Sequence, residues 1–231
     1  MQEKTVPIET DTPQAMRRLF IAIGIWLALI MLAVLFATPE QFSILFNEQG
    51  PIEGLSTPAW IILGAWCLDP WHPRVKPLLT CGVMALFGGM READWQHSEI
   101  THSTMLKVSF YMNPLPPIWH KLLAAIFTLA LLATVVVGLR QLLAYVRASG
   151  SVRAALQPAW ARVFVTGFLL TAFSKFLDRL INGLVEWGGP HIDGLAGRFI
   201  GGYEEGIELL LPFVFAYALW LFRRQQLAAK R

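Results

Sequence analysis

The chain has 231 residues, of which 55% are hydrophobic and 15% are charged, with a formal net charge of +3. A soluble domain of this length usually carries about a quarter charged residues, so the composition argues against a soluble globular protein and favours a membrane protein. The basic residues lie between apolar segments, which excludes a nucleic-acid-binding patch and makes membrane lipids the expected partners.

Six apolar segments follow one another along the chain, and a membrane-spanning helix needs roughly 20 such residues. They cover residues 19–38, 52–68, 77–90, 119–139, 160–181 and 204–222. The third is short in apolar residues, because it runs into an Arg-Glu-Ala-Asp-Trp stretch that must lie at or inside the membrane interface. The predicted fold class is therefore all-α, a polytopic transmembrane bundle of about six helices.

The first apolar segment resembles a secretory signal only in part. It follows a long polar leader, it is longer than a typical signal core, and bulky Leu35 stands where a small residue is preferred before Ala37. We expect it to be retained as a helix. The predicted organisation is a polar cytoplasmic leader (1–18), a single transmembrane helical domain (19–222) and a basic cytoplasmic tail (223–231).

Charge predicts the orientation of this bundle. An even number of spans puts both chain ends on one face, and most of the 19 Lys and Arg residues fall on that face. The excess of basic residues in cytoplasmic loops then predicts a multi-pass protein of a bacterial-type inner membrane with both termini in the cytoplasm. Most of the 16 Asp and Glu residues fall on the opposite, outer side, which the same rule does not explain.

Several of these outer charges belong to predicted helices rather than to loops. Lys175 follows Arg162 by about 20 Å of helix, so it should lie within the outer leaflet. A charge there costs about 3 kcal/mol or more unless it is paired or faces a wet cavity. Lys175 and Asp178 share one helical face, and so do Glu204 and Glu208, whose mutual repulsion favours binding of a proton or a cation.

The densest polar stretch runs from Arg91 to His97. On a continued helix, Asp94 and His97 lie one turn apart and form a carboxylate–imidazole pair, which suits a general base or a metal site. Arg91 suits an anionic headgroup or phosphate. A competing interpretation is an interfacial belt, in which Arg, Trp and His only anchor the helix end in the headgroups.

These patterns select eight candidate site residues. The catalytic candidates are acids and one imidazole, namely Asp94, His97, Asp178, Glu204 and Glu208. The substrate-binding candidates are Glu53, Arg91 and Lys175. A divalent metal is a candidate cofactor, with Asp94, His97 and Glu208 as its ligands. Ser174, next to Lys175, is not a nucleophile signature, because adjacent helix residues point in different directions.

An early membrane glutamate, the Arg-Glu-x-Asp-Trp-x-His stretch and a late Glu-Glu-x-x-Glu-Leu stretch together resemble uncharacterised bacterial polytopic inner-membrane proteins. Three functions stay open. The first is an enzyme, a hydrolase or transferase that acts on a lipid or lipid-linked substrate. The second is a transporter or channel subunit, and the third is a membrane scaffold or assembly protein.

Overall fold

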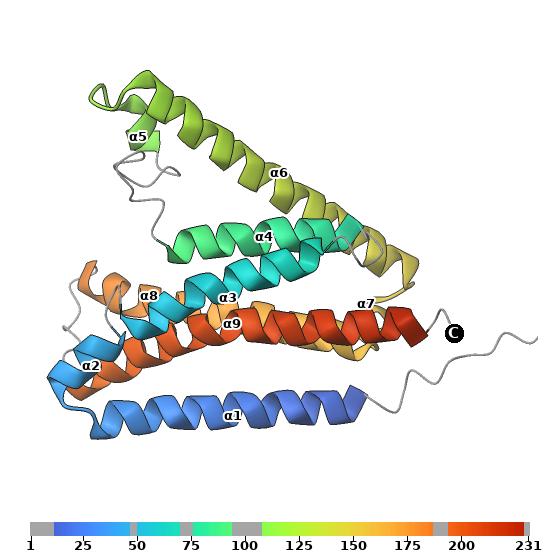
Figure 1. Cartoon of the computed structure of the whole chain (residues 1–231), viewed down its shortest axis with the longest axis horizontal. Coiled ribbons are helices and arrows are strands. Elements are labelled where there is room, and N and C mark those ends of the chain that lie inside the picture. Colours follow the sequence, from blue (N-terminus) through green and yellow to red (C-terminus); the bar gives the residue numbers. More distant parts are fainter. Residues whose placement is uncertain (1–11, 47–49, 70–75, 94–107, 187–193, 229–231) are drawn as a thin grey trace, which may run out of the picture. The chain divides into compact units, whose positions relative to one another are not determined.

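A computed structural model describes residues 12–46, 50–69, 76–93, 108–186 and 194–228, with residues 181–186 described by their backbone alone. Of these residues 91% are helical, and none forms a strand (Figure 1). The helices of this part of the chain are α1 (Thr12–Phe36), α2 (Pro39–Phe46), α3 (Pro51–Leu68), α4 (Lys76–Glu92), α5 (Val108–Met112), α6 (Ile118–Ala148), α7 (Val152–Ala155), α8 (Ala159–Glu186) and α9 (Gly194–Ala228).

Four of the described helices are long and apolar enough to cross a membrane: α1, α6, α8 over Ala159–Leu180, and α9. The all-helical class and the membrane-protein composition agree with the prediction. Helices α3 and α4 have 18 and 17 residues, just below the roughly 20 that a span needs. The total of six spans and the orientation of the chain ends therefore stay predictions.

Two helices begin earlier than their apolar segments. Helix α1 begins at Thr12 rather than near residue 19, and α9 begins at Gly194 rather than near residue 204. An apolar segment shows where the side chains are apolar. The helix itself can extend further, through polar residues, as long as its backbone hydrogen bonds are made. At α9 the start coincides with a positive φ of 68° at Gly194, a conformation that glycine adopts without strain.

The chain divides into two compact units. Unit 1 is Met1–Ser56 with Ser149–Arg231, and unit 2 is Thr57–Ala148, so that α3 passes from one unit to the other. In unit 2, α4 packs against α6 and against α3, where Gly88 lies under the ring of Trp60. Small residues at such crossings let helices approach closely without a soluble-type core.

The three long helices of unit 1 are α1, α8 and α9, and α9 lies at their centre. Gly167 of α8 meets Phe215 of α9, and Trp160 meets Phe222, so these two helices are antiparallel. Helix α1 is also antiparallel to α9 and runs beside it (Figure 1). In the most apolar 18-residue stretch of each helix, 56% of the residues of α9 are buried, against 17% for α1 and 28% for α8. Helix α9 therefore supplies most of the interior surface of this unit.

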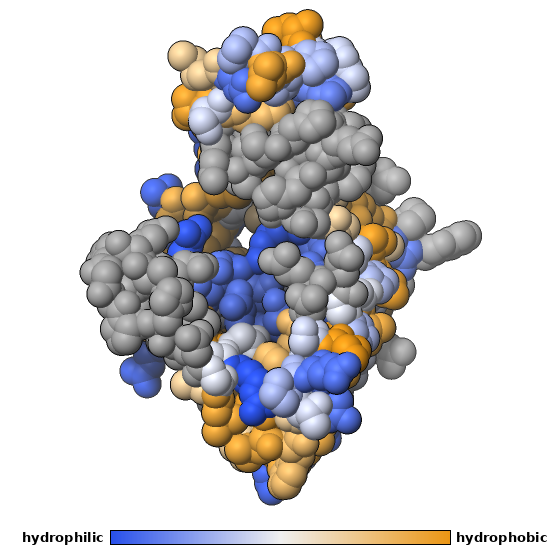
Figure 2. All heavy atoms as spheres, turned by 90° about the vertical axis from the view of Figure 1, so that its left-hand side faces the viewer, coloured by the Kyte–Doolittle hydropathy of each residue, from blue (hydrophilic) through white to orange (hydrophobic). Residues whose placement is uncertain are grey.

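Glycines fix the close approach of α1 to α9. A Cβ added to Gly206 would lie 2.8 Å from Cδ1 of Ile30, and one added to Gly202 would lie 2.8 Å from a methyl of Val34. Both partners are buried. The outward faces of the helices carry many exposed apolar side chains, as helices that meet lipid require. On the face that Figure 2 draws, apolar residues (orange) are densest in the lower part, and hydrophilic ones (blue) lie beside them.

Candidate functional site

Charged residues of unit 1 separate to its two ends. The start of α1, the start of α8 and the end of α9 share one end, as shown by the bonds from Thr12 to the Gln157 carbonyl and from Tyr217 to the Ala15 carbonyl. We call it the basic end, since its charged residues in the described part are all arginines: Arg17, Arg18, Arg153, Arg162, Arg223 and Arg224. The opposite end holds Asp178 and Glu208, two of the carboxylates that the sequence singled out.

The residues at that opposite end include a charged cluster, which we define as Ser174, Lys175, Asp178 and Glu208. The Ser174 hydroxyl donates a hydrogen bond to Oε1 of Glu208 at 2.9 Å. The Lys175 ammonium lies 2.6 Å from the same oxygen and 3.6 Å from Oδ2 of Asp178. Two helices therefore contribute to one connected polar group, with a single cation between two carboxylates.

The spacing on α8 explains this arrangement. Ser174 and Leu177 are buried and face α9, whereas Phe173 and Phe176 are exposed. Lys175 lies at the edge of the buried face, and its long side chain can lie along apolar surface while the ammonium reaches polar partners. Asp178, one turn after Ser174, lies at the same edge and meets that ammonium.

Exposure increases from the centre of the cluster outward. Ser174 is fully buried, and the Glu208 side chain is 9% exposed. The Lys175 and Asp178 side chains are 39% and 31% exposed. Ser174 and Glu208 are thus packed inside the protein, while Lys175 and Asp178 are exposed enough to reach a ligand. A buried carboxylate needs such donors, because its desolvation otherwise costs several kcal/mol.

Pro212 adds a polar feature to the backbone at the cluster. It is buried inside α9 and has no N–H, so the Glu208 carbonyl does not receive the hydrogen bond that residue 212 donates in an ordinary helix. Two residues before Glu208 in the same helix, the Trp26 indole donates to the Gly206 carbonyl at 2.7 Å. A proline and an inserted side chain are both common causes of a bend in a helix, and neighbouring side chains can satisfy the backbone groups freed there.

Arg198 closes the same end of unit 1. Its Nη1 donates to the Ala37 carbonyl at 2.9 Å, and its guanidinium lies 5.8 Å from the ring centre of Phe42 in α2. Carbonyls at a helix C-terminus lack intrahelical donors and attract cations. Arg198 therefore satisfies the end of α1 and ties α2 to α9, which makes its role one of positioning.

The structure brings together three of the predicted site residues, Lys175, Asp178 and Glu208. Two others, Glu53 and Glu204, are half-buried in the same unit. Arg91 lies in unit 2, where its Nη1 is 2.9 Å from Oε1 of the buried Glu92. The remaining two, Asp94 and His97, lie outside the described residues, so their part in a site stays a prediction.

Ser174 is the cluster member that sequence reasoning set aside. Its position next to Lys175 raises only the question of a nucleophile, which the sequence does not support. In the structure its hydroxyl donates to Glu208 instead. The usable signal was its spacing of four residues from Asp178, which places both on one side of the helix.

No group of three or more His, Cys, Asp or Glu side chains suited to a metal ion occurs within the described part of the chain. Glu208 lies there, but its Oε1 already contacts the Lys175 ammonium, and a second cation beside an ammonium is repelled. A metal held by Asp94, His97 and Glu208 is not tested, because two of these ligands fall outside the described residues.

Comparison of the chain with protein-family models, with curated proteins and with solved structures finds no match. The resemblance to uncharacterised bacterial inner-membrane proteins stays a prediction. Chemically, the cluster combines an ammonium that can hold an anionic group with a half-exposed carboxylate that can take or give a proton.

Proposed function

We propose that the chain is a multi-pass protein of a bacterial-type inner membrane with both termini in the cytoplasm. We further propose that its charged cluster belongs to an enzyme, a hydrolase or transferase, that acts on a lipid or lipid-linked substrate at the outer leaflet. The four long apolar helices support this placement, and so does the basic end of unit 1, whose described charged residues are all arginines.

The observation that carries the proposal is the position of Lys175 between a buried and a half-exposed carboxylate. Glu208 holds the ammonium in place, and Ser174 holds Glu208. The ammonium then binds an anionic group of the substrate, such as a phosphate, and stabilises negative charge that grows during the reaction. Ser174 is fully buried, so it acts as a positioning residue and not as a nucleophile.

Asp178 is the proposed general base. It takes a proton from water, or from an acceptor hydroxyl in a transferase, as that oxygen forms a bond to the acyl or phosphoryl centre of the substrate. The bond to the leaving oxygen breaks, and the leaving oxygen receives the proton that Asp178 holds. No oxidant or reductant is needed.

The test uses the purified full chain in liposomes of phosphatidylethanolamine, phosphatidylglycerol and cardiolipin, with products followed by mass spectrometry over time. We expect wild type to form a new lipid product and Asp178→Asn and Lys175→Gln to lose at least about 100-fold in rate. Arg179→Gln is the matched control, because Arg179 is the exposed neighbour of Asp178. No product from wild type, or equal rates in wild type and Asp178→Asn, would exclude this enzyme.

The burial of Ser174 and Glu208 favours a second function, a scaffold in which the cluster only fixes the packing of α8 on α9. In that case Lys175→Gln loses stability, Asp178→Asn unfolds almost like wild type, and no lipid product forms with any of the variants. A transporter is less well supported, because residues 209–216 of α9, beyond the cluster, are apolar and offer no polar path onward.

A further inference from the structure

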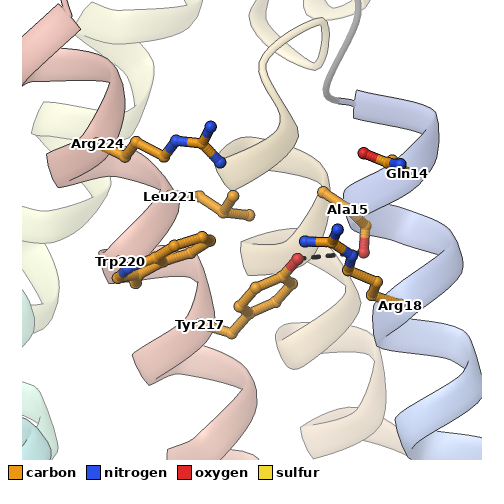
Figure 3. A pocket seen from close by; sticks show the side chains of 7 residues that line it. All are labelled: Gln14, Ala15, Arg18, Tyr217, Trp220, Leu221 and Arg224. Atoms are coloured by element: carbon orange, nitrogen blue, oxygen red, sulfur yellow. Dashed lines mark hydrogen bonds between the residues drawn. The ribbon is translucent and has the colours of Figure 1, made fainter.

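The basic end of unit 1 holds a pocket of about 120 Å³ between α1 and α9 (Figure 3). Arg18 and Gln14 of α1 line one side, and Tyr217, Trp220 and Arg224 of α9 line the other. In Figure 3 the guanidinium groups of Arg18 and Arg224 extend from the two helices toward the space between them. The pocket lies on the opposite end of the unit from the charged cluster and shares no residue with it.

Aromatic side chains hold the α9 side of this pocket in place. The Tyr217 hydroxyl donates to the Ala15 carbonyl at 3.5 Å, which joins the two helices beside the pocket. The Trp220 ring stacks on Tyr217 with centroids 5.8 Å apart, and the Arg224 guanidinium lies 5.6 Å from the centre of the same Trp220 ring. A guanidinium over an indole is oriented, so less of its conformational freedom remains to be lost on binding.

The electrostatics of the pocket favour an anion. Two guanidinium groups face one space, and the described residues at this end of unit 1 include no carboxylate. The positive dipole end at the start of α1 is opposed by the negative end of α9, so the two guanidinium groups supply the attraction. A guanidinium binds phosphate oxygens through two parallel N–H donors, whereas a chloride ion uses only one such direction.

Location and size restrict the anion further. The pocket lies where α1 and α9 leave their apolar stretches, at the level where Trp and Arg meet lipid headgroups. Its volume of about 120 Å³ is enough for a phosphate group.

We infer that this pocket binds the phosphate group of an anionic phospholipid headgroup in the leaflet that faces the chain ends. Arg18 and Arg224 clamp the phosphate from the two helices, Gln14 donates a further hydrogen bond, and Trp220 lies against the glycerol backbone. The site ties α1 to α9 through the lipid. It does not depend on the enzyme proposed above.

The test is native mass spectrometry and thermal unfolding of the full chain in a neutral detergent, with three probes at equal phosphate concentration: phosphatidylglycerol, phosphatidylcholine and inorganic phosphate. We expect wild type to retain one phosphatidylglycerol and to unfold at a higher temperature with it than with phosphatidylcholine. The double variant Arg18→Gln/Arg224→Gln should bind phosphatidylglycerol at least about tenfold more weakly.

Arg17→Gln is the matched control, because Arg17 is the exposed neighbour of Arg18 and does not line the pocket. It should change the affinity less than about threefold. Equal binding of phosphatidylglycerol and phosphatidylcholine by wild type overturns the inference even if no variant can be purified. Equal losses in the control and the double variant overturn it too. Stabilisation by inorganic phosphate alone assigns the same pocket to free phosphate and rejects the lipid.

Discussion

Glu208 and Arg224 belong to the same helix, α9, yet the protein treats their charges in different ways. Glu208 is buried, and its carboxylate contacts Ser174 and Lys175. Arg224 is exposed and lies over Trp220 beside a pocket. A charge in the interior must be neutralised by the protein itself, whereas a charge at the rim can be neutralised by a ligand or by solvent.

The packing of α1 on α9 differs between the same two ends. Beside the cluster, Gly202 and Gly206 let Ile30 and Val34 approach the α9 backbone closely. Near the basic end, the large side chains of Tyr217 and Trp220 occupy α9, and the pocket lies between the helices. Close packing of α1 on α9 therefore accompanies the buried centre of the cluster, while larger side chains between the helices accompany a pocket at the basic end.

The largest expected effect comes from breaking the cluster at Glu208. Glu208→Leu leaves Asp178, at 3.6 Å, as the carboxylate of the cluster that faces the Lys175 ammonium. Removing one partner of a buried pair costs about 3–5 kcal/mol, and because the Lys175 side chain is 39% exposed we expect about 2–3 kcal/mol of lost unfolding free energy. Denaturation in detergent, followed by tryptophan fluorescence, measures it.

Two companion variants sharpen this result. Arg224→Leu at the basic end should change the unfolding free energy by no more than about 0.5 kcal/mol, as is usual for exposed positions. Lys175→Met/Glu208→Leu removes both charges and should be more stable than Glu208→Leu alone, since an apolar pair often replaces a buried ion pair without loss. Equal effects at Glu208 and Arg224 would contradict the distinction between interior and rim.

The next effect concerns the close packing at Gly206. Gly206→Val places new atoms against Ile30, which is 3% exposed and has little room to move. Overpacking of this kind costs about 1–3 kcal/mol. Gly201 is the control on the same helix, because a Cβ there meets nothing within 4 Å, so Gly201→Ala should stabilise the protein by up to about 1 kcal/mol. Thermal unfolding distinguishes the opposite signs.

A smaller effect is expected from Ser174→Ala. The variant loses a hydrogen bond to a carboxylate, worth about 1.5 kcal/mol, and opens almost no cavity. Thr171→Ala is the matched change one turn earlier on α8, where the hydroxyl donates only to the Gly167 carbonyl of its own helix at 2.9 Å. It should cost less than about 0.5 kcal/mol. Similar losses of unfolding free energy in both variants would mean that the Ser174–Glu208 hydrogen bond stabilises the protein no more than a hydroxyl bonded within its own helix.

Much of unit 1 could be predicted from the sequence. The apolar segments located α1, α8 and α9, because a membrane-spanning helix must be apolar over most of its length. The three- and four-residue spacings placed Lys175 with Asp178 on one face, and burial cost predicted that Lys175 needs a partner. The sequence did not identify that partner, because Glu208 is one of several carboxylates at the same level.

The rest could not be predicted because it depends on how helices rotate and pair. Periodicity gives the face of one helix but not which residue of a second helix lies opposite, so Ser174 and Glu208 could not be joined from spacing alone. The pocket at the basic end depends on the distance between α1 and α9, which the bulk of Tyr217 and Trp220 influences. Helix starts at Thr12 and Gly194 were missed because polar residues can continue a helix past its apolar part.

The smallest effect on stability is expected at Asp178, and it separates the proposed enzyme from the scaffold. The Lys175–Asp178 pair is 3.6 Å apart, within one helix and partly exposed, and such pairs contribute about 0.3–0.5 kcal/mol. Asp178→Asn should therefore unfold almost like wild type in the denaturation experiment used for Glu208. An enzyme that uses Asp178 as its base loses turnover in this variant, while a scaffold does not change, because the bonds of Glu208 to Ser174 and Lys175 remain. A folded Asp178→Asn protein without product formation, beside an active Arg179→Gln protein, thus assigns the outer edge of the cluster to chemistry and its buried centre to packing.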